Sequence, residues 1–136
     1  MKKKIKAFIE IGKNLDYDIW LDPDDETPFG LLGQGNTISE AKRDFLDCYE
    51  DMRKSYSKKG KEFPEIEFEF VYDVPSFLKY SPFPLRWLSN ATGINQRQLS
   101  HYTTERKKPT RVTLGKIQNA VHNFIVDYSQ VHFVSD

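Results

Sequence analysis

The sequence contains a single cysteine, Cys48, so no disulfide can form within one chain, and one unpaired thiol fits a reducing compartment. No segment approaches about eighteen consecutive apolar residues, the length that a membrane-spanning helix needs. The lysines at positions 2–4 are not followed by the apolar core of a secretory signal. These absences argue against a disulfide-rich or membrane-spanning protein, and we expect a cytoplasmic one.

The chain also has no net charge, with 20 basic and 20 acidic residues, but the charges are unevenly distributed. Residues 1–73 carry 12 basic and 17 acidic side chains, a balance of −5. Residues 74–136 carry 8 basic and 3 acidic side chains, a balance of +5. Opposite charge on two halves suggests two modules with different partners, and the basic half is the candidate for binding a polyanion.

Alternating apolar residues predict several strands in the acidic half. Every second residue from 5 to 11 is apolar, which is typical of a half-buried strand. Turn-forming residues follow at 12–16 and the alternation resumes at 17–21, so we predict a hairpin. A third short strand is predicted over 29–32, ending at a pair of glycines. A fourth is predicted over 66–72, where apolar residues, most of them aromatic, alternate largely with glutamates.

A helix is predicted between the third and fourth of these strands. Thr37 stands three residues before Glu40, the spacing of a capping box that opens a helix. Apolar residues then recur at steps of three and four, as in an amphipathic helix; they are Ile38, Ala41, Phe45, Cys48, Tyr49 and Met52. The helix should fray at 57–60. The expected order over residues 1–73 is therefore β-β-β-α-β.

The link between the third strand and this helix carries a resemblance to a known family. The segment Gly33-x-Gly35-x-Thr37-x-x-Glu40-Ala41, in this order of elements, is similar to the HicB antitoxins, whose N-terminal domain is a partial RNase-H-like sheet with one helix. In that family this domain binds a small toxin that cleaves mRNA, while a C-terminal domain binds DNA and represses the operon. The resemblance implies a small basic HicA-like toxin as partner, and an acidic domain suits such a partner.

Beyond a boundary that we place at residues 73–76, the sequence predicts short helices separated by prolines and glycines. Pro84 suits the first turn of a helix, where its missing N–H does no harm. The expected inward face of that helix consists of Leu85, Leu88 and Ala91. Gly93 then suits the left-handed residue at which a helix ends, and Ile94 is an apolar residue in the turn.

A second short helix follows over about residues 96–104, and Asn95 can cap it through its side-chain oxygen. Leu99 and Tyr102 are its expected inward residues. Its outward residues include no acid; they are Gln96, Arg97, Ser100 and His101, with Gln98 at the edge. Glutamine and arginine can form paired hydrogen bonds with adenine and guanine in the major groove of DNA. Basic residues just after the helix would lie near backbone phosphates; they are Arg106, Lys107, Lys108 and Arg111.

This half of the chain resembles the lambda-repressor-like (XRE) helix-turn-helix domains. The resemblance lies in Leu88-x4-Gly93-Ile94-Asn95-x3-Leu99-Ser100-x-Tyr102, then Arg106-Lys107-Lys108-Pro109-Thr110 and Leu114-x2-Ile117. In that family one helix lies on the DNA backbone and the next enters the major groove. By position, the base contacts would be Gln96, Arg97, His101 and Ser100, and the phosphate contacts Asn95, Gln98, Arg106, Lys107, Lys108 and Arg111. The sequence departs from the family at Ser89, commonly alanine, and at Leu85, commonly a polar phosphate-binding residue.

We therefore expect an α+β protein with a HicB-like domain at 1–73, an all-helical helix-turn-helix domain at 74–130 and a tail at 131–136. The expected function is sequence-specific repression at a double-stranded operator, combined with neutralisation of a toxin. One short reading helix covers few base pairs, so we expect a palindromic operator and a homodimer or higher even oligomer. The dimer surface is left open between the N-terminal sheet and the apolar tail around Tyr128.

Two other functions remain open from the sequence. The first is a protein-interaction or dimerisation module whose helix-turn-helix is degenerate and which has no toxin partner. The second is an RNA-directed hydrolase with catalytic carboxylates at Asp16 or Asp18. The carboxylates at 22–26 lack the spacing of a calcium-binding EF-hand, and the apolar position of Cys48 favours a structural thiol over a nucleophile. We therefore predict no catalytic residue, metal or cofactor.

Overall fold

The structure is a computed structural model that describes residues 2–135. It confirms a mixture of α and β structure, with a four-stranded mixed sheet and five helices. The chain divides into two compact units, one ending at Tyr80 and the other beginning at Ser81. In the described residues no helix is both long enough and apolar enough to cross a membrane.

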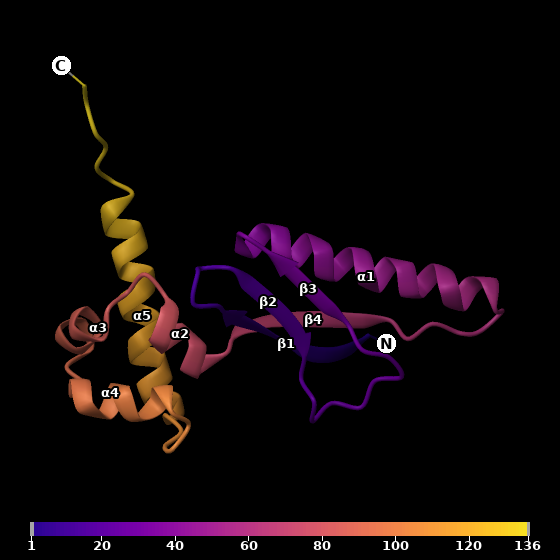
Figure 1. Cartoon of the computed structure of the whole chain (residues 1–136), viewed down its shortest axis with the longest axis horizontal. Helices are drawn as coiled ribbons and strands as arrows, with labels where there is room; N and C mark the ends of the chain where they lie inside the picture. Colours follow the sequence, from indigo (N-terminus) through magenta and orange to yellow (C-terminus); the bar gives the residue numbers. More distant parts are fainter. Residues whose placement is uncertain (1, 136) are drawn as a thin grey trace. The chain divides into compact units, whose positions relative to one another are not determined.

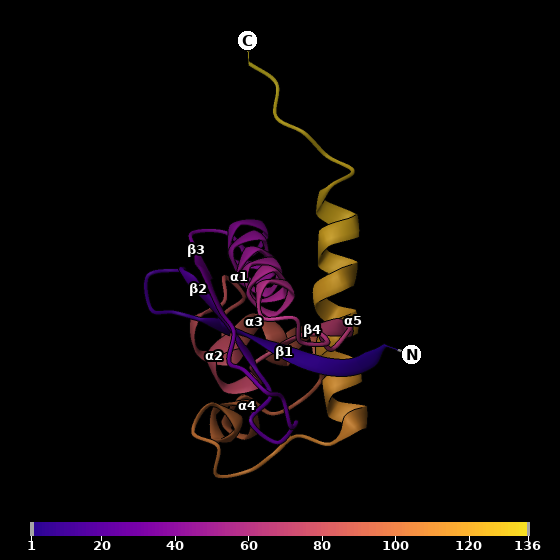
Figure 2. The same ribbon diagram turned by 90° about the vertical axis from the view of Figure 1, so that its right-hand side faces the viewer.

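The first unit is built on a sheet with the strand order β3-β2-β1-β4. Its strands are β1 (Lys3–Ile11), β2 (Tyr17–Leu21), β3 (Leu32–Gly35) and β4 (Ile66–Tyr72). β2 pairs antiparallel with both β1 and β3, whereas β4 runs parallel to β1. A parallel pair needs a long crossover connection. That connection contains α1 (Ile38–Lys58), which lies along one face of the sheet (Figures 1 and 2).

The core of the first unit lies between α1 and the sheet. The apolar face predicted for the first strand is buried, and Ile5 and Ala7 are almost completely inaccessible to solvent. From the helix, Ala41, Phe45 and Tyr49 pack against this face. The predicted amphipathic stripe therefore identifies the helix surface that covers the sheet.

The position of the third strand differs from the prediction. It was expected over 29–32 and to end at glycines, but β3 begins at Leu32 and contains both Gly33 and Gly35. Added to Gly33, a Cβ would lie only 2.5 Å from the Cβ of Phe45, and at Gly35 it would lie 2.6 Å from the Ala41 backbone nitrogen. The glycines are part of the strand because α1 packs directly on its backbone.

The predicted start and end of α1 are confirmed. The Thr37 hydroxyl accepts a hydrogen bond from the Glu40 backbone N–H at 3.0 Å. The Glu40 carboxylate in turn accepts one from the Asn36 N–H at 2.9 Å, so two otherwise free donors at the helix start are satisfied. At the other end the cap is Lys59, followed by Gly60 in a left-handed conformation with φ of 65°.

The helix α2 (Val74–Tyr80) follows the boundary predicted from the sequence but belongs to the first unit. The Ser76 hydroxyl accepts a hydrogen bond from the backbone N–H of Ile11 at 3.0 Å and donates one to the Asp73 carbonyl at 3.1 Å. The ring of Phe77 also lies against that of Tyr72, with 4.9 Å between centroids. These contacts hold α2 at the end of β1, whereas the predicted boundary lies at its start.

The second unit is helical in its described residues. It consists of α3 (Leu85–Thr92), α4 (Gln96–Thr103) and α5 (Arg111–Tyr128), with α3 packed against both α4 and α5 (Figure 1). Its core consists of Leu88, Leu99, Tyr102, Ile117 and Val121. Phe83, Trp87 and Phe124 form an aromatic cluster with centroid distances of 5.2–5.4 Å.

Two details of the second unit correct the sequence-based expectations. Pro84 is the residue before α3 rather than its first helical residue, with φ of −62° and ψ of 148°. Ala91 was expected to face inward but is exposed, because the buried face of α3 runs through Leu88 and the half-buried Thr92. After α5, residues 131–135 form neither helix nor strand.

Candidate nucleic-acid interface

The candidate interface is set up by the turn between α3 and α4. Gly93 has φ of 76°, as predicted, and its N–H bonds to the Ser89 carbonyl at 2.9 Å. The Ser89 hydroxyl donates a hydrogen bond to the Ile94 carbonyl at 2.6 Å. The Thr92 hydroxyl donates to the Leu88 carbonyl at 2.6 Å and accepts from the Ile94 N–H at 3.2 Å. Ser89, which departs from the family pattern, therefore fastens the turn through its side chain.

α4 begins at this turn with the cap predicted for it. The Asn95 side-chain oxygen accepts a hydrogen bond from the Arg97 backbone N–H at 2.8 Å. Leu99 and Tyr102 are buried, as predicted, and they fix the rotation of the helix about its axis. The Gln98 amide donates a hydrogen bond to the Tyr102 hydroxyl at 2.7 Å. Asn95 and Gln98 were predicted as phosphate contacts. In the structure the side-chain oxygen of Asn95 and the side-chain nitrogen of Gln98 each form a hydrogen bond within α4 or its cap.

The predicted base contacts lie together on the outward side of α4. Gln96, Arg97, Ser100 and His101 are all exposed. Residues four apart lie one turn apart on a helix, so Gln96 neighbours Ser100 and Arg97 neighbours His101. The helix contains no acidic residue. This face offers hydrogen-bond donors and acceptors with one permanent positive charge.

The predicted phosphate contacts beyond α4 lie in the connection to α5. Arg106, Lys107 and Lys108 are exposed, and Arg111 is the exposed first residue of α5. None of the four has an acidic partner within 4.0 Å among residues 2–135. The connection includes Glu105, whose φ of 60° is unusual for a residue other than glycine. It ends at Thr110, whose hydroxyl caps α5 by accepting from the Thr113 N–H at 3.2 Å.

One further basic residue was overlooked in the sequence. Arg86 lies beside Leu85 in the first turn of α3 and is exposed. Lambda-repressor-like domains, which this half resembles, often carry a polar phosphate-binding residue at the position of Leu85, whereas the side chain here is apolar and half-buried. The signal that could have identified Arg86 is its position at a helix start with no acid in the same turn. Arg86 is thus a candidate for the backbone contact that Leu85 cannot make.

The acidic residues considered as a catalytic site are placed in the first unit. Asp18 accepts a hydrogen bond from the Gln34 amide at 3.2 Å, and Asp22 accepts one from the Asp24 N–H at 2.9 Å within its own loop. Among residues 2–135, no three histidine, cysteine, aspartate or glutamate side chains are grouped so that they could hold a metal ion. The Cys48 thiol is half-buried and donates to the Leu32 carbonyl at 3.3 Å.

Comparison with known proteins found no family model, no curated protein and no solved structure that matches the chain.

Proposed function

We propose that this protein is a sequence-specific DNA-binding transcriptional repressor of the HicB antitoxin type. In this proposal a small β-β-β-α-β sheet domain precedes a helix-turn-helix domain of the XRE class, and the protein acts in the cytoplasm. The observation that carries the proposal is the outward face of α4, where Gln96, Arg97, Ser100 and His101 are exposed together on a helix without acids.

The dimensions of α4 support this role. A helix with its side chains is about 10–12 Å in diameter, which fits the roughly 12 Å width of the major groove, and the 8 residues of α4 supply about two turns of it. The tight turn at Gly93 and the Asn95 cap present the first turn of α4 as the leading end, so Gln96 and Arg97 would meet base edges first. The basic residues at 106–108, with Arg111, would contact phosphates and set the register.

The role of the first unit in this proposal is to bind and neutralise a small basic RNA-cleaving toxin. Its acidic balance favours such a partner, because complementary charge speeds encounter and suppresses unsuitable partners. Two copies of the chain would place two reading helices on a palindromic operator, about one helical turn apart.

Fluorescence anisotropy with the DNA upstream of the gene, against a scrambled duplex of equal length, tests the DNA-binding proposal. Arg97→Ala should reduce the preference for the native sequence by about 1–3 kcal/mol at one position. Lys107→Ala should weaken both duplexes equally and flatten the dependence on salt. Lys54→Ala, which removes the same charge from α1, is the control and should change neither. Equal affinity for native and scrambled DNA would contradict sequence-specific repression.

A second candidate function is a protein-interaction or dimerisation module with a degenerate helix-turn-helix and no toxin partner. It is favoured by the apolar side chains exposed at the end of α5 and beyond, which are Ile125, Val126, Tyr128, Val131, Phe133 and Val134. Sedimentation of the full chain with and without Phe133→Ser tests it. A dimer that dissociates in this variant, together with no DNA retention at low salt, would favour the second function over the first.

A further inference from the structure

The sheet face opposite α1 carries an apolar row that crosses all four strands. The strand register places Phe8 beside Trp20 on β2 and beside Val71 on β4, and it places Trp20 beside Leu32 on β3. The rings of Phe8 and Trp20 stack with 4.8 Å between centroids. At about 4.8 Å per strand, the row, here called the cross-strand row, is roughly 14 Å long.

The cross-strand row is accessible to solvent in the first unit. Phe8, Trp20 and Val71 are half-buried, and Leu32 exposes 49% of its surface. The equivalent residues on the other face, such as Ala7 and Ile19, are completely buried under α1. When a partner covers such a row of apolar side chains, their surface is removed from water, and this stabilises the complex.

Charges on the two sides of the row differ. On one side Lys4 lies beside Glu67 and Lys6 beside Glu69, so the opposite charges of β1 and β4 offset each other. On the other side Glu10 lies beside Asp18, and no basic residue is paired in register with either. The strands of this face therefore carry two more carboxylates than lysines, and the excess lies at Glu10 and Asp18.

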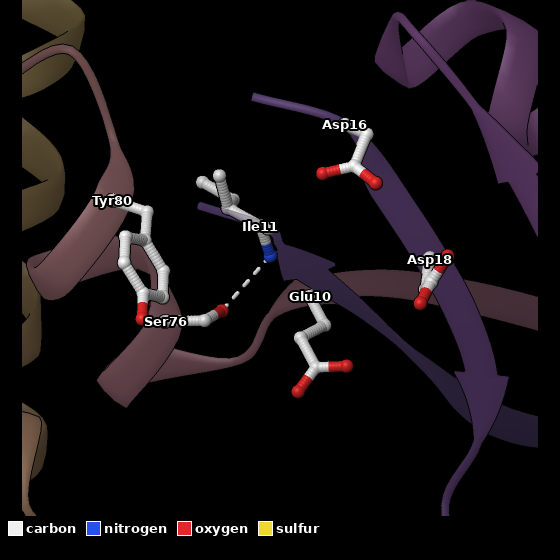
Figure 3. Close-up of a pocket in the computed structure, with 7 residues that line it drawn as sticks. Glu10, Ile11, Asp16, Asp18, Ser76 and Tyr80 are labelled. Carbon is white, nitrogen blue, oxygen red and sulfur yellow. Dashed lines mark hydrogen bonds between the residues drawn. The ribbon is translucent and has the colours of Figure 1, made fainter. Parts of the chain in front are cut away.

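A hollow of about 270 Å³ adjoins this acidic side, far larger than one water molecule requires. It is lined by Glu10, Ile11, Gly12, Asp16, Asp18, Ser76 and Tyr80. Of the carboxylates, Glu10 lies on β1, Asp18 on β2 and Asp16 in the turn between these strands, and the last two residues lie on α2 (Figure 3). Burial, followed by the negative charges of Asp73 and Asp18, raises the pKa of Glu10. A positive group in the hollow would relieve this repulsion.

We propose that the cross-strand row and its acidic side form a docking surface for a basic amphipathic segment of a partner protein. Apolar side chains of the partner cover Phe8, Trp20 and Leu32, and a lysine or arginine side chain enters the hollow. A second copy of this chain fits the same face less well, because it would bring an excess of carboxylates against an excess of carboxylates. The inference rests on the proposed function only in naming the surface to which its basic partner binds.

The chain provides its own reporter for a direct test. Of its two tryptophans, Trp20 lies in the row and Trp87 lies in α3, so Trp87→Phe leaves Trp20 as the only tryptophan. The full chain with this change is titrated at low salt with three synthetic peptides of equal length. One is an amphipathic leucine–lysine helix, the second is its leucine–glutamate counterpart, and the third replaces the leucines of the first with serine. We expect Trp20 emission to shift with the leucine–lysine peptide, and the other two to bind at least tenfold more weakly.

Matched variants locate the binding on the row. Leu32→Ser should weaken the leucine–lysine peptide about fivefold, whereas Leu46→Ser, on α1 and exposed to 41%, should change binding less than twofold. The double change Glu10→Gln and Asp18→Asn should weaken binding about tenfold and reduce its dependence on salt. Its control, Asp47→Asn with Asp51→Asn, removes the same charge from exposed positions of α1 and should have little effect.

Three results would overturn the proposal. The first is equal binding of the leucine–lysine and leucine–glutamate peptides. The second is equal loss of binding in Leu32→Ser and Leu46→Ser. The third is sedimentation as a dimer that Leu32→Ser dissociates, which would assign the row to a second copy instead. None of these measurements depends on α4, and Leu32→Ser should bind DNA as the wild type does. Failure of the docking surface and failure of the DNA-binding proposal are therefore distinguishable.

Discussion

Hydrogen bonds differ in range between the two units of this protein. In the first unit β1 pairs with β4, which lies beyond α1 in the sequence, and Ser76 of α2 bonds to Ile11. In the second unit the hydrogen bonds that shape the interface are local, as between Ser89 and Ile94 or between Gln98 and Tyr102. The difference teaches that the attachment of α2 and β4 depends on residues distant in the sequence, whereas the turn before α4 is shaped by its own neighbours.

The two halves of the chain also differ in charge. The net charge is negative before residue 74 and positive from there on. Within residues 81–126 the sequence has one acid, Glu105, against seven basic residues. In the proposed function this difference would steer DNA to the second unit and a basic protein to the first. Substitutions in the two units should therefore differ in their effects on stability, on DNA binding and on the dependence of stability on pH.

The largest effect is expected where the first unit depends on a distant contact. In Gly33→Ala the new Cβ would lie 2.5 Å from the Phe45 Cβ and 2.7 Å from its backbone nitrogen, so α1 must move off β3. We expect a loss of about 3 kcal/mol in the unfolding free energy of the first unit. Urea unfolding followed by Trp20 emission, in the Trp87→Phe background, measures it.

Gly30→Ala is the control for this change, because no atom lies within 4 Å of the added Cβ. Its effect should stay within roughly 0.5 kcal/mol. DNA binding by the second unit should survive both substitutions. Equal destabilisation by Gly33→Ala and Gly30→Ala would contradict the close packing of α1 on the backbone of β3.

A smaller effect is expected at the turn of the second unit. Gly93 and Gly60 both have positive φ, 76° and 65°, and neither has an atom within 4 Å of an added Cβ. Alanine at either position should therefore cost only the left-handed backbone penalty, about 1 kcal/mol. Gly93→Ala should also weaken DNA binding severalfold, because this turn orients α4, whereas Gly60→Ala should leave it unchanged. Urea unfolding measures the stability of both variants, and fluorescence anisotropy measures their affinity for DNA. If both substitutions changed the DNA affinity equally, the turn at Gly93 would have no special role in recognition.

The smallest effect is expected from two carboxylates of the first unit with opposite shifts. Burial raises the pKa of Glu10, so its ionisation costs stability as the pH rises through its folded pKa. Hydrogen bonds from Arg53 lower the pKa of Glu65, so its stabilisation is present above the ordinary carboxyl pKa and is lost as the pH falls through the folded value. At neutral pH, Glu10→Gln should raise the urea midpoint slightly and Glu65→Gln should lower it. Both differences should vanish in acid, and shifts of the same sign would contradict this assignment.

Local patterns allowed much of the fold to be predicted. The alternation at 5–11 identified β1 and its buried face, and the spacing of Thr37 and Glu40 located the start of α1. In the second unit the caps and turn are also local, so Gly93 and Asn95 were predicted with the roles that the structure gives them. The exposure of Gln96, Arg97, Ser100 and His101 followed from the two buried positions of α4, although their contact with DNA remains a prediction.

What the sequence did not reveal depends on contacts between distant residues. Glycine generally weakens a strand, so Gly33 and Gly35 indicated the end of β3, and only the helix packed on them explains their place within it. The association of α2 with the first unit rests on the bond between Ser76 and Ile11. The cross-strand row was hidden for the same reason, because its members become neighbours only when the register of all four strands is known.

The hydrogen bond from Cys48 to the Leu32 carbonyl has a practical consequence. It joins α1 to β3 at the residue whose side chain lies on the opposite face, in the cross-strand row. Burial raises the pKa of this thiol, and thiolates rather than thiols react with alkylating reagents. Alkylation of this single, half-buried cysteine should therefore be slower than that of an unhindered thiol. A molecule that binds Leu32 on the far side of the sheet and shifts β3 should alter this hydrogen bond, so the labelling rate of Cys48 would report its binding.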